Sequence, residues 1–186
     1  MKVTKVVSGV TFLSDINASD FANHIRTDNT GDPADVLDCL KSAAAYVEKV
    51  SWTPLSTKTI TFIASDWGDY EFDLEFNGTL SNPTCTYYNT SNVSASLTIT
   101  SSWLEQTDVN ASTLHVVAAS YPSLYDRADA ITITITLAPI LSATPPELKM
   151  AIYLLGAYYY DCRVNDKEPQ VTVVEKIVIG VRQKEF

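Results

Sequence analysis

The chain has 186 residues, with 13 Lys or Arg against 22 Asp or Glu, so its formal net charge is −9. A chain of this length buries about 70% of its unfolded surface and folds as one domain, or as one domain with a large insertion. The negative charge argues against tight binding to nucleic acid or to an anionic membrane surface, because both need clustered cations. It permits loose passage of DNA, since an acidic wall repels phosphate.

The N-terminal segment predicts an extended stretch followed by a short helix. Residues 1–15 are partly apolar and predict an extended arm or an edge strand. A helix near residues 17–26 is predicted because Asn17 can cap it and Asp20 stands at its third position. No long apolar run follows Met1, so no secretory signal is expected and the predicted compartment is the cytoplasm.

A second helix is predicted over residues 33–50. The Asp32-Pro33 pair gives a cap followed by proline at the first helical position. Apolar residues then recur at three- and four-residue steps, which is the helical period. These residues are Val36, Leu37, Leu40, Ala43, Ala44 and Val47. We expect Leu37, Leu40 and Val47 to lie in the fold core.

From residue 57 to about residue 140 the period changes from helical to two. Apolar residues alternate with Thr or charged residues, which is typical of half-buried antiparallel strands. The alternating segments are 59–63, 70–76, 96–100, 114–117 and 131–137. Turn residues separate them, at Asn77-Gly78, Ser81-Asn82-Pro83 and Tyr121-Pro122. The block is predicted to form an inserted β-sandwich or small barrel.

A third helix is predicted over residues 145–163, with Thr144 as its cap. It carries no charged residue from Met150 to Tyr160, so nearly every side of it is apolar or aromatic. One domain must surround such a helix, or a neighbouring subunit must cover part of it. We expect Leu148, Ile152 and Leu155 to face residues 33–50 as core, which leaves an adjacent stripe of Ala151, Leu154 and Tyr158 for another contact.

Four residues of this helix are predicted to form a subunit interface: Tyr153, Leu154, Tyr158 and Tyr160. Tyrosine is enriched at protein interfaces. A stacking platform for nucleic acid is the alternative, but the tyrosines have no basic companions.

The last segment, residues 165–186, is predicted to be an extended docking tail. Its β-branched residues favour strands, and no hairpin partner stands beside it in the sequence. An unpaired strand is a template for pairing with a neighbouring chain. The residues expected to dock are Val171, Val173, Val174, Ile177, Ile179 and Arg182. The alternative is that the tail folds back onto its own β domain.

No catalytic or metal-binding pattern is recognised, so we predict neither an enzyme nor a cofactor. His24 and His115 have no Cys or carboxylate at ligand spacing, and the odd set of Cys39, Cys85 and Cys162 follows no zinc pattern. Four acidic residues stand two apart on one predicted strand and so share one face of it. We expect this row to face solvent and not to supply a catalytic pair of carboxylates. They are Asp69, Glu71, Asp73 and Glu75.

Three stretches resemble the head-to-tail adaptor, or connector, proteins of tailed bacteriophages and gene-transfer particles: Ile16–Arg26, Asp35–Glu48 and Pro145–Arg163. In that family the first helix ends in a hydrophobic-Arg pair before acidic residues, as Ile25-Arg26 does here. The last helix opens with Pro and closes with an aromatic-x-x-Arg, as Tyr160 and Arg163 do. The tail departs from the Leu-Leu-x-x-Tyr-Arg-like finish of longer relatives.

The resemblance implies an α+β virion protein in the neck, assembled in the host cytoplasm. It implies a homo-oligomeric ring, usually of twelve copies, beneath the portal protein. The ring extends the DNA channel used in packaging and ejection, and receives a stopper or tail-completion protein. Residues 1–56 and 141–164 would form the helical adaptor core, 57–140 the inserted β domain and 165–186 the docking tail. The alternative is a virion β-module that binds carbohydrate or a receptor through Trp67 and Trp103, anchored by its helices.

Overall fold

The computed structural model divides the chain into two compact units. The β unit comprises Met1–Thr11 and Ser56–Ile140, and the helical unit comprises Phe12–Leu55 and Leu141–Phe186. The N-terminal segment therefore belongs to the β unit, whereas the sequence assigned all of residues 1–56 to the helical core. The residues that the structure describes are 4–25, 33–67, 72–73, 78–108, 111–165 and 172–182.

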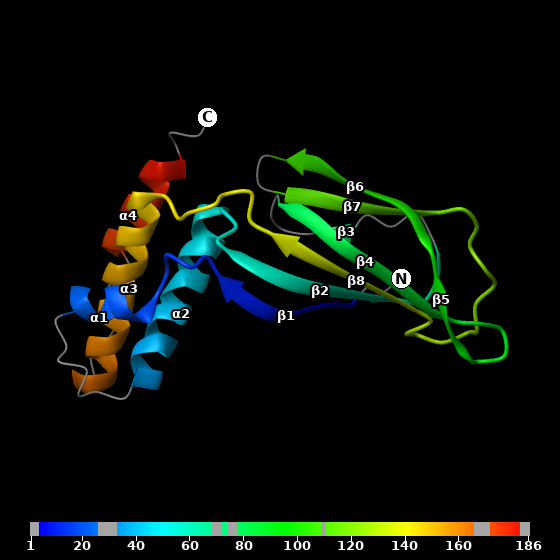
Figure 1. The fold of residues 1–186 in the computed structure, drawn as a ribbon, viewed down its shortest axis with the longest axis horizontal. Helices are drawn as coiled ribbons and strands as arrows, with labels where there is room; N and C mark the ends of the chain where they lie inside the picture. The colour runs from blue at the N-terminus through cyan, green and yellow to red at the C-terminus, as the bar shows by residue number, and fades with distance from the viewer. Residues whose placement is uncertain are drawn as a thin grey trace. The chain divides into compact units, whose positions relative to one another are not determined.

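The strands of the β unit form, within the described residues, one five-stranded sheet and one three-stranded sheet. They are β1 (Thr4–Phe12), β2 (Ser56–Ala64), β3 (Phe72–Asp73), β4 (Thr79–Tyr88), β5 (Ser94–Leu97), β6 (Ile99–Asp108), β7 (Ala111–Ala118) and β8 (Ile131–Ala138). The larger sheet has the order β1-β2-β8-β4-β5 and the smaller one the order β3-β7-β6 (Figure 1). The first segment is thus an edge strand, one of the two forms predicted for it.

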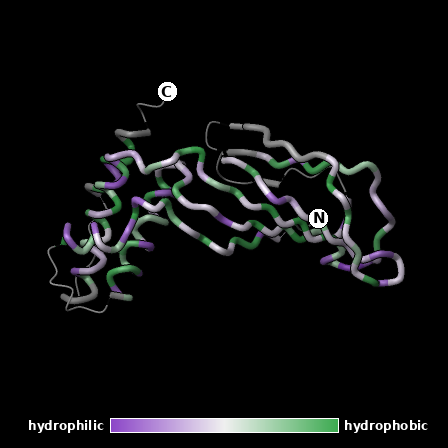
Figure 2. Tube along the Cα trace, in the orientation of Figure 1, coloured by the Kyte–Doolittle hydropathy of each residue, from purple (hydrophilic) through white to green (hydrophobic). Residues whose placement is uncertain are grey.

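Strand β8 is the centre of the larger sheet and confirms the predicted period of two. It pairs antiparallel with β2 on one side and β4 on the other. Its buried side chains are Ile131, Ile133, Ile135 and Leu137, and they alternate with half-buried threonines. Figure 2 colours the chain trace by the hydropathy of each residue. Leu114 of β7 is fully buried in the same hydrophobic cluster, so the two sheets share one core, as in a sandwich.

Strand β4 corrects the turn predicted at Ser81-Asn82-Pro83. The strand continues through these residues, and its pairing with β8 shifts register between Ser81 and Thr84. Asn82 has a φ of 50°. Such a bulge tolerates both a left-handed residue and a proline, because the extra residue leaves the hydrogen-bonded ladder. Of the predicted strand 70–76, only Phe72 and Asp73 lie within the described residues.

The helical unit completes the α+β architecture that the sequence predicted. Its described helices are α1 (Ala18–His24), α2 (Pro33–Ser51), α3 (Pro146–Asn165) and α4 (Thr172–Arg182). Helix α3 packs against both α2 and α4, α1 packs against α2, and α2 also contacts α4. None of the helices in the described part of the chain is long and apolar enough to cross a membrane.

Helix α2 buries one row of side chains, and the row differs by one residue from the prediction. Val36, Leu40 and Val47 are buried, whereas Leu37 is only half-buried. Residues 36, 40, 43 and 47 stand three or four apart and share one face of a helix. Leu37 is rotated about 100° from Val36 and falls at the margin of that face.

The C-terminal segment corrects the predicted extended tail, because residues 172–182 form helix α4. Val174 and Val178 stand one helical turn apart and are both fully buried in the helical core. Their β-branched side chains favour strands only weakly, and burial of an apolar helical face outweighs that preference. The segment neither stays free nor folds back onto the β unit as a strand.

A polar contact also joins α4 to α2. The Tyr46 hydroxyl donates a hydrogen bond to Glu175 Oε1 at 2.9 Å. This hydrogen bond, together with burial, raises the pKa of Tyr46 above its ordinary value. Because the neutral phenol is the donor, the bond is present at neutral pH and is lost as the pH rises through that raised pKa.

The start of α3 differs from the predicted cap. The helix begins at Pro146, and Pro145 O accepts the first helical hydrogen bond, from Lys149 N at 2.9 Å. The Thr144 N–H and hydroxyl both donate to the Asp15 carboxylate, each at 3.0 Å. Asp15 therefore ties the segment before α1 to the segment before α3.

We expect Asp15→Ala to lower the free energy of unfolding by about 2 kcal/mol, because two hydrogen bonds to a charged acceptor are lost at the buried Thr144. Chemical denaturation measures the change. Asp161→Ala removes an exposed carboxylate from α3 and serves as the control. Equal stability of the two variants would show that the hydrogen bonds from Thr144 to Asp15 do not stabilise the fold.

We expect Val178→Asp to destabilise the helical unit strongly, because it places an unpaired charge at a fully buried position. Ile179→Asp is the matched control, since Ile179 is the next residue of α4 and is 49% exposed. Thermal unfolding followed by far-ultraviolet circular dichroism compares them. The docking of α4 is wrong if Val178→Asp melts at the wild-type temperature.

Candidate assembly surface

Helix α3 is the centre of the helical unit, and the other helices cover most of its surface. Leu148, Ile152 and Leu155 are fully buried in one cluster, together with Leu40 and Val47 of α2. These three residues were predicted to pack against residues 33–50, and they share a core with α2.

Helix α1 covers another side of α3 at Gly156. A Cβ atom at Gly156 would lie 2.8 Å from Cζ of the Phe21 ring, which is closer than side chains tolerate. Glycine at this position therefore lets the fully buried Phe21 ring seat against the α3 backbone.

Tyr153 lies on the α1 side of α3 and corrects its assignment to a subunit interface. It is only 7% exposed, and its ring centre lies 5.7 Å from that of Phe21 and 5.5 Å from that of His24. Burial raises the pKa of the Tyr153 hydroxyl. The Lys149 ammonium lies 5.6 Å from the ring centre and 3.5 Å from the Asp20 carboxylate, which sits in the first turn of α1. Tyr153 therefore holds α1 to α3 within one chain.

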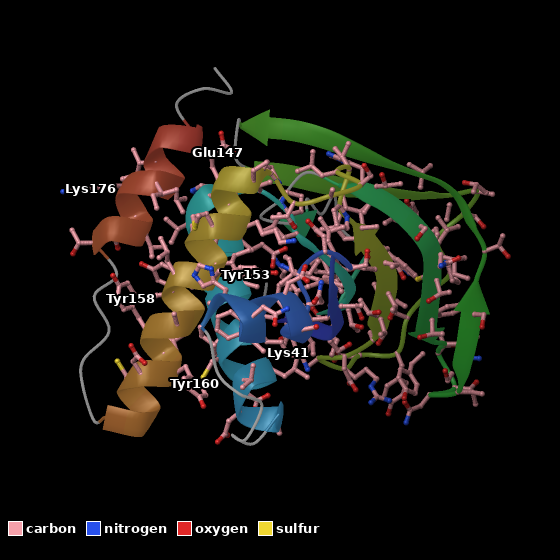
Figure 3. All side chains as sticks on the ribbon, turned by 60° about the vertical axis from the view of Figure 1, so that its left-hand side comes forward. Lys41, Glu147, Tyr153, Tyr158, Tyr160 and Lys176 are labelled. Carbon is pink, nitrogen blue, oxygen red and sulfur yellow. The ribbon has the colours of Figure 1, made fainter. Side chains whose placement is uncertain are left out.

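A second stripe of α3 remains partly open to solvent. Met150 is 50% exposed, and Leu154 and Tyr158 are half-buried. These residues stand four apart and so share one face, which we call the α3 stripe. The sequence analysis placed Ala151 in this stripe, but Ala151 is fully buried. It missed Met150, although the spacing of Met150 from Leu154 gives the signal. Figure 3 shows Tyr158 and Tyr160 further along the same helix, and Tyr160 is half-buried against the core.

The predicted docking residues of the C-terminal segment fall into three groups. Val174 is fully buried and Ile177 packs half-buried against the core, so both stabilise the chain's own fold. Ile179 is 49% exposed and is available for contact. Val171 and the side chains of Val173 and Arg182 lie outside the described residues.

An open depression of about 560 Å³ lies between α2 and α3, lined by Asp38, Cys39, Lys41, Ser42 and Tyr159. Burial raises the pKa of the Tyr159 hydroxyl above its ordinary value. Cys39 is 4% exposed and is not part of a disulfide. The described lining residues include one cation, one carboxylate and two hydroxyl groups, which suits polar contact with another surface.

The other residues considered for chemistry are dispersed. His24 stacks on Tyr153 in the helical unit, while His115 belongs to β7 of the β unit. Burial raises the pKa of the Cys85 thiol to about 11, so this cysteine is protonated and unreactive at neutral pH. Within the described residues, no three His, Cys, Asp or Glu side chains gather as metal ligands. Asp69, Glu71 and Glu75 lie outside those residues, as does the side chain of Asp73.

The chain shares its fold with proteins of gene transfer agent (GTA) particles. No protein-family model and no curated protein sequence matches it. A chain in the structure of the virion of a native GTA particle is 20% identical, with a TM-score of 0.63 over 97% of this chain and 94% of that chain. A chain in the neck of an empty GTA particle, computed with C6 symmetry, is 17% identical, with a TM-score of 0.60 over 98% and 95%. A chain in the neck of a native GTA particle, computed with C12 symmetry, is 15% identical, with a TM-score of 0.59 over 94% of each chain.

Proposed function

We propose that this protein is a structural component of a virion neck, a head-to-tail adaptor that forms a ring beneath the portal protein. The observation that carries the proposal is the extent of the fold similarity. It covers at least 94% of each chain compared, so both units and their order are matched, and two of those chains come from necks. The adaptor resemblance of the helical segments points to the same role independently.

The α3 stripe supports assembly of several copies. It presents Met150, Leu154 and Tyr158 without a charge, on a helix whose Leu148, Ile152 and Leu155 are buried within the chain. Exposed apolar side chains that line up on one helix face are typical of interfaces. We propose that the stripe, with Tyr160, contacts the neighbouring copy in the ring. Twelve copies agree with the C12 symmetry used for one of the similar necks.

A ring of this kind would contact two other proteins of the particle. The portal protein would lie on one face, and a stopper or tail-completion protein on the other. The exposed Ile179 of α4, with Arg182 at the end of that helix, would contact the portal. A net charge of −9 suits a channel through which DNA passes in packaging and ejection, because an acidic wall does not hold phosphate. This role requires no catalysis and no cofactor.

The mass of the purified protein, alone and mixed with its portal protein, tests the proposal. We expect a multi-copy ring in at least one of the two samples. Light scattering coupled to size-exclusion chromatography gives the mass. A wild-type protein that stays a single chain in both samples would overturn the ring.

A pair of substitutions on α3 tests which surface forms the ring. Tyr158→Asp should give a folded single chain, because it charges the half-exposed α3 stripe. Leu155→Asp should unfold the helical unit, because Leu155 is fully buried. Tyr158→Phe keeps the aromatic ring and should assemble as the wild type does. Normal assembly of both aspartate variants would show that α3 forms no interface.

A further inference from the structure

A second depression lies at one end of the β unit, where three strands of the larger sheet end or begin. Ala64 at the end of β2 is paired with Ile131 at the start of β8, which is in turn paired with Tyr87 near the end of β4. The segments beyond these strand ends therefore come together. They enclose an open volume of about 560 Å³, lined by Ser65, Asp66, Trp67, Pro122, Ser123, Leu124, Tyr125 and Asp126.

Two aromatic side chains, Trp67 and Tyr125, line this depression, and Trp67 is held in place by its own contacts. The indole Nε1–H donates a hydrogen bond to Pro122 O at 2.7 Å. The Trp67 ring centre lies 5.2 Å from that of Tyr121 and 5.9 Å from that of Tyr87. Tyr121 and Tyr125 are 49% and 42% exposed. Aromatic surface held in place and open to solvent is a stacking platform.

The loop that carries Tyr125 is held to the sheet before any ligand binds. Tyr125 N–H donates to Tyr88 O at 3.0 Å, and Leu124 forms an isolated β-bridge with Asn89. The Arg127 guanidinium lies 3.6 Å from the centre of the Tyr88 ring and donates to both Asp129 carboxylate oxygens, at 2.6 and 2.7 Å. Preorganisation of this kind lowers the entropy cost of binding.

The polar part of the lining indicates the chemical class of the ligand. Asp66 and Asp126 are exposed carboxylates that accept hydrogen bonds, and the Ser65 and Ser123 hydroxyls both donate and accept. The described lining residues include no Lys or Arg, so an anionic ligand such as phosphate or nucleic acid is disfavoured. Asp and Ser are depleted at protein interfaces, so a docked protein segment is also disfavoured.

We propose that this depression binds a neutral carbohydrate, a short oligosaccharide of hexose or N-acetylhexosamine units. The apolar C–H face of a pyranose ring stacks on Trp67 and Tyr125, and its hydroxyl groups donate to Asp66 and Asp126. The volume falls within the range of about 300–1,000 Å³ that is usual for small-molecule sites. This activity is additional to the neck role and does not depend on ring formation. Trp103, the other tryptophan considered for it, belongs to β6, and its side chain lies outside the described residues.

Saturation-transfer NMR on the full-length protein tests the proposal with three series of oligosaccharides. The probes are α-linked glucose, β-linked glucose and β-linked N-acetylglucosamine oligomers of two to six units. We expect saturation transfer to at least one series at millimolar concentration. Failure of all three series to bind would overturn the proposal.

Substitutions of two exposed side chains locate the binding. Tyr125→Ala removes the ring and should weaken binding about tenfold, equivalent to about 1.4 kcal/mol. Tyr125→Phe keeps the ring and should retain binding. Asp126→Ala should weaken binding without changing the melting temperature. Unchanged affinity in both alanine variants would place any sugar binding elsewhere and overturn the site. Loss of neck assembly in these variants, with no sugar bound by the wild type, would identify the depression as a protein contact instead.

Discussion

The helical unit depends on one constraint, the burial of α3, which carries no charge between Met150 and Tyr160. Such a helix is not stable with most of its surface in water, and the three other helices of the described residues pack around it. Helix α2 takes the stripe of Leu148, Ile152 and Leu155, and α1 inserts Phe21 at Gly156. Helix α4 contributes Val174 and Val178 to the same core. These helices leave the α3 stripe partly exposed. The ring interface is proposed at this stripe because it is uncharged and exposed.

The two units carry different kinds of surface, and this supports a division of labour. The helical unit leaves an uncharged stripe of Met150, Leu154 and Tyr158 that suits contact with another copy of the chain. The β unit instead presents aromatic rings together with carboxylates and hydroxyls at the strand ends, which suits a polar ligand. In the two proposals made above, the helices mediate assembly and the β unit recognises carbohydrate. The two proposed functions can be tested separately because each unit has its own hydrophobic core.

The C-terminal segment illustrates how tertiary packing overrides local preference. Its valines and isoleucines predict a strand from the sequence, and the sequence contains no visible partner for it. In the folded chain α2 and α3 supply that partner. Val174, Ile177 and Val178 pack into the helical core at helical spacing, and the Tyr46–Glu175 hydrogen bond joins α4 to α2. The segment is therefore part of the fold, and the contact surface it offers is reduced to residues such as Ile179.

The sequence by itself determined the elements whose periodicity is strong. The alternation from Ile131 to Leu137 specified β8 as a half-buried strand, and the spacing of Leu40 and Val47 specified the buried face of α2. The uncharged run of α3 also showed that this helix had to be surrounded. Only the tertiary structure decided which groups would surround it. It placed Tyr153 between Phe21 and His24 and used Thr144 to bind Asp15. It also drew Trp67 and Tyr125 to one depression from segments far apart in the chain. Periodicity reports which face of an element is buried, whereas the identity of its partner depends on contacts between residues distant in sequence.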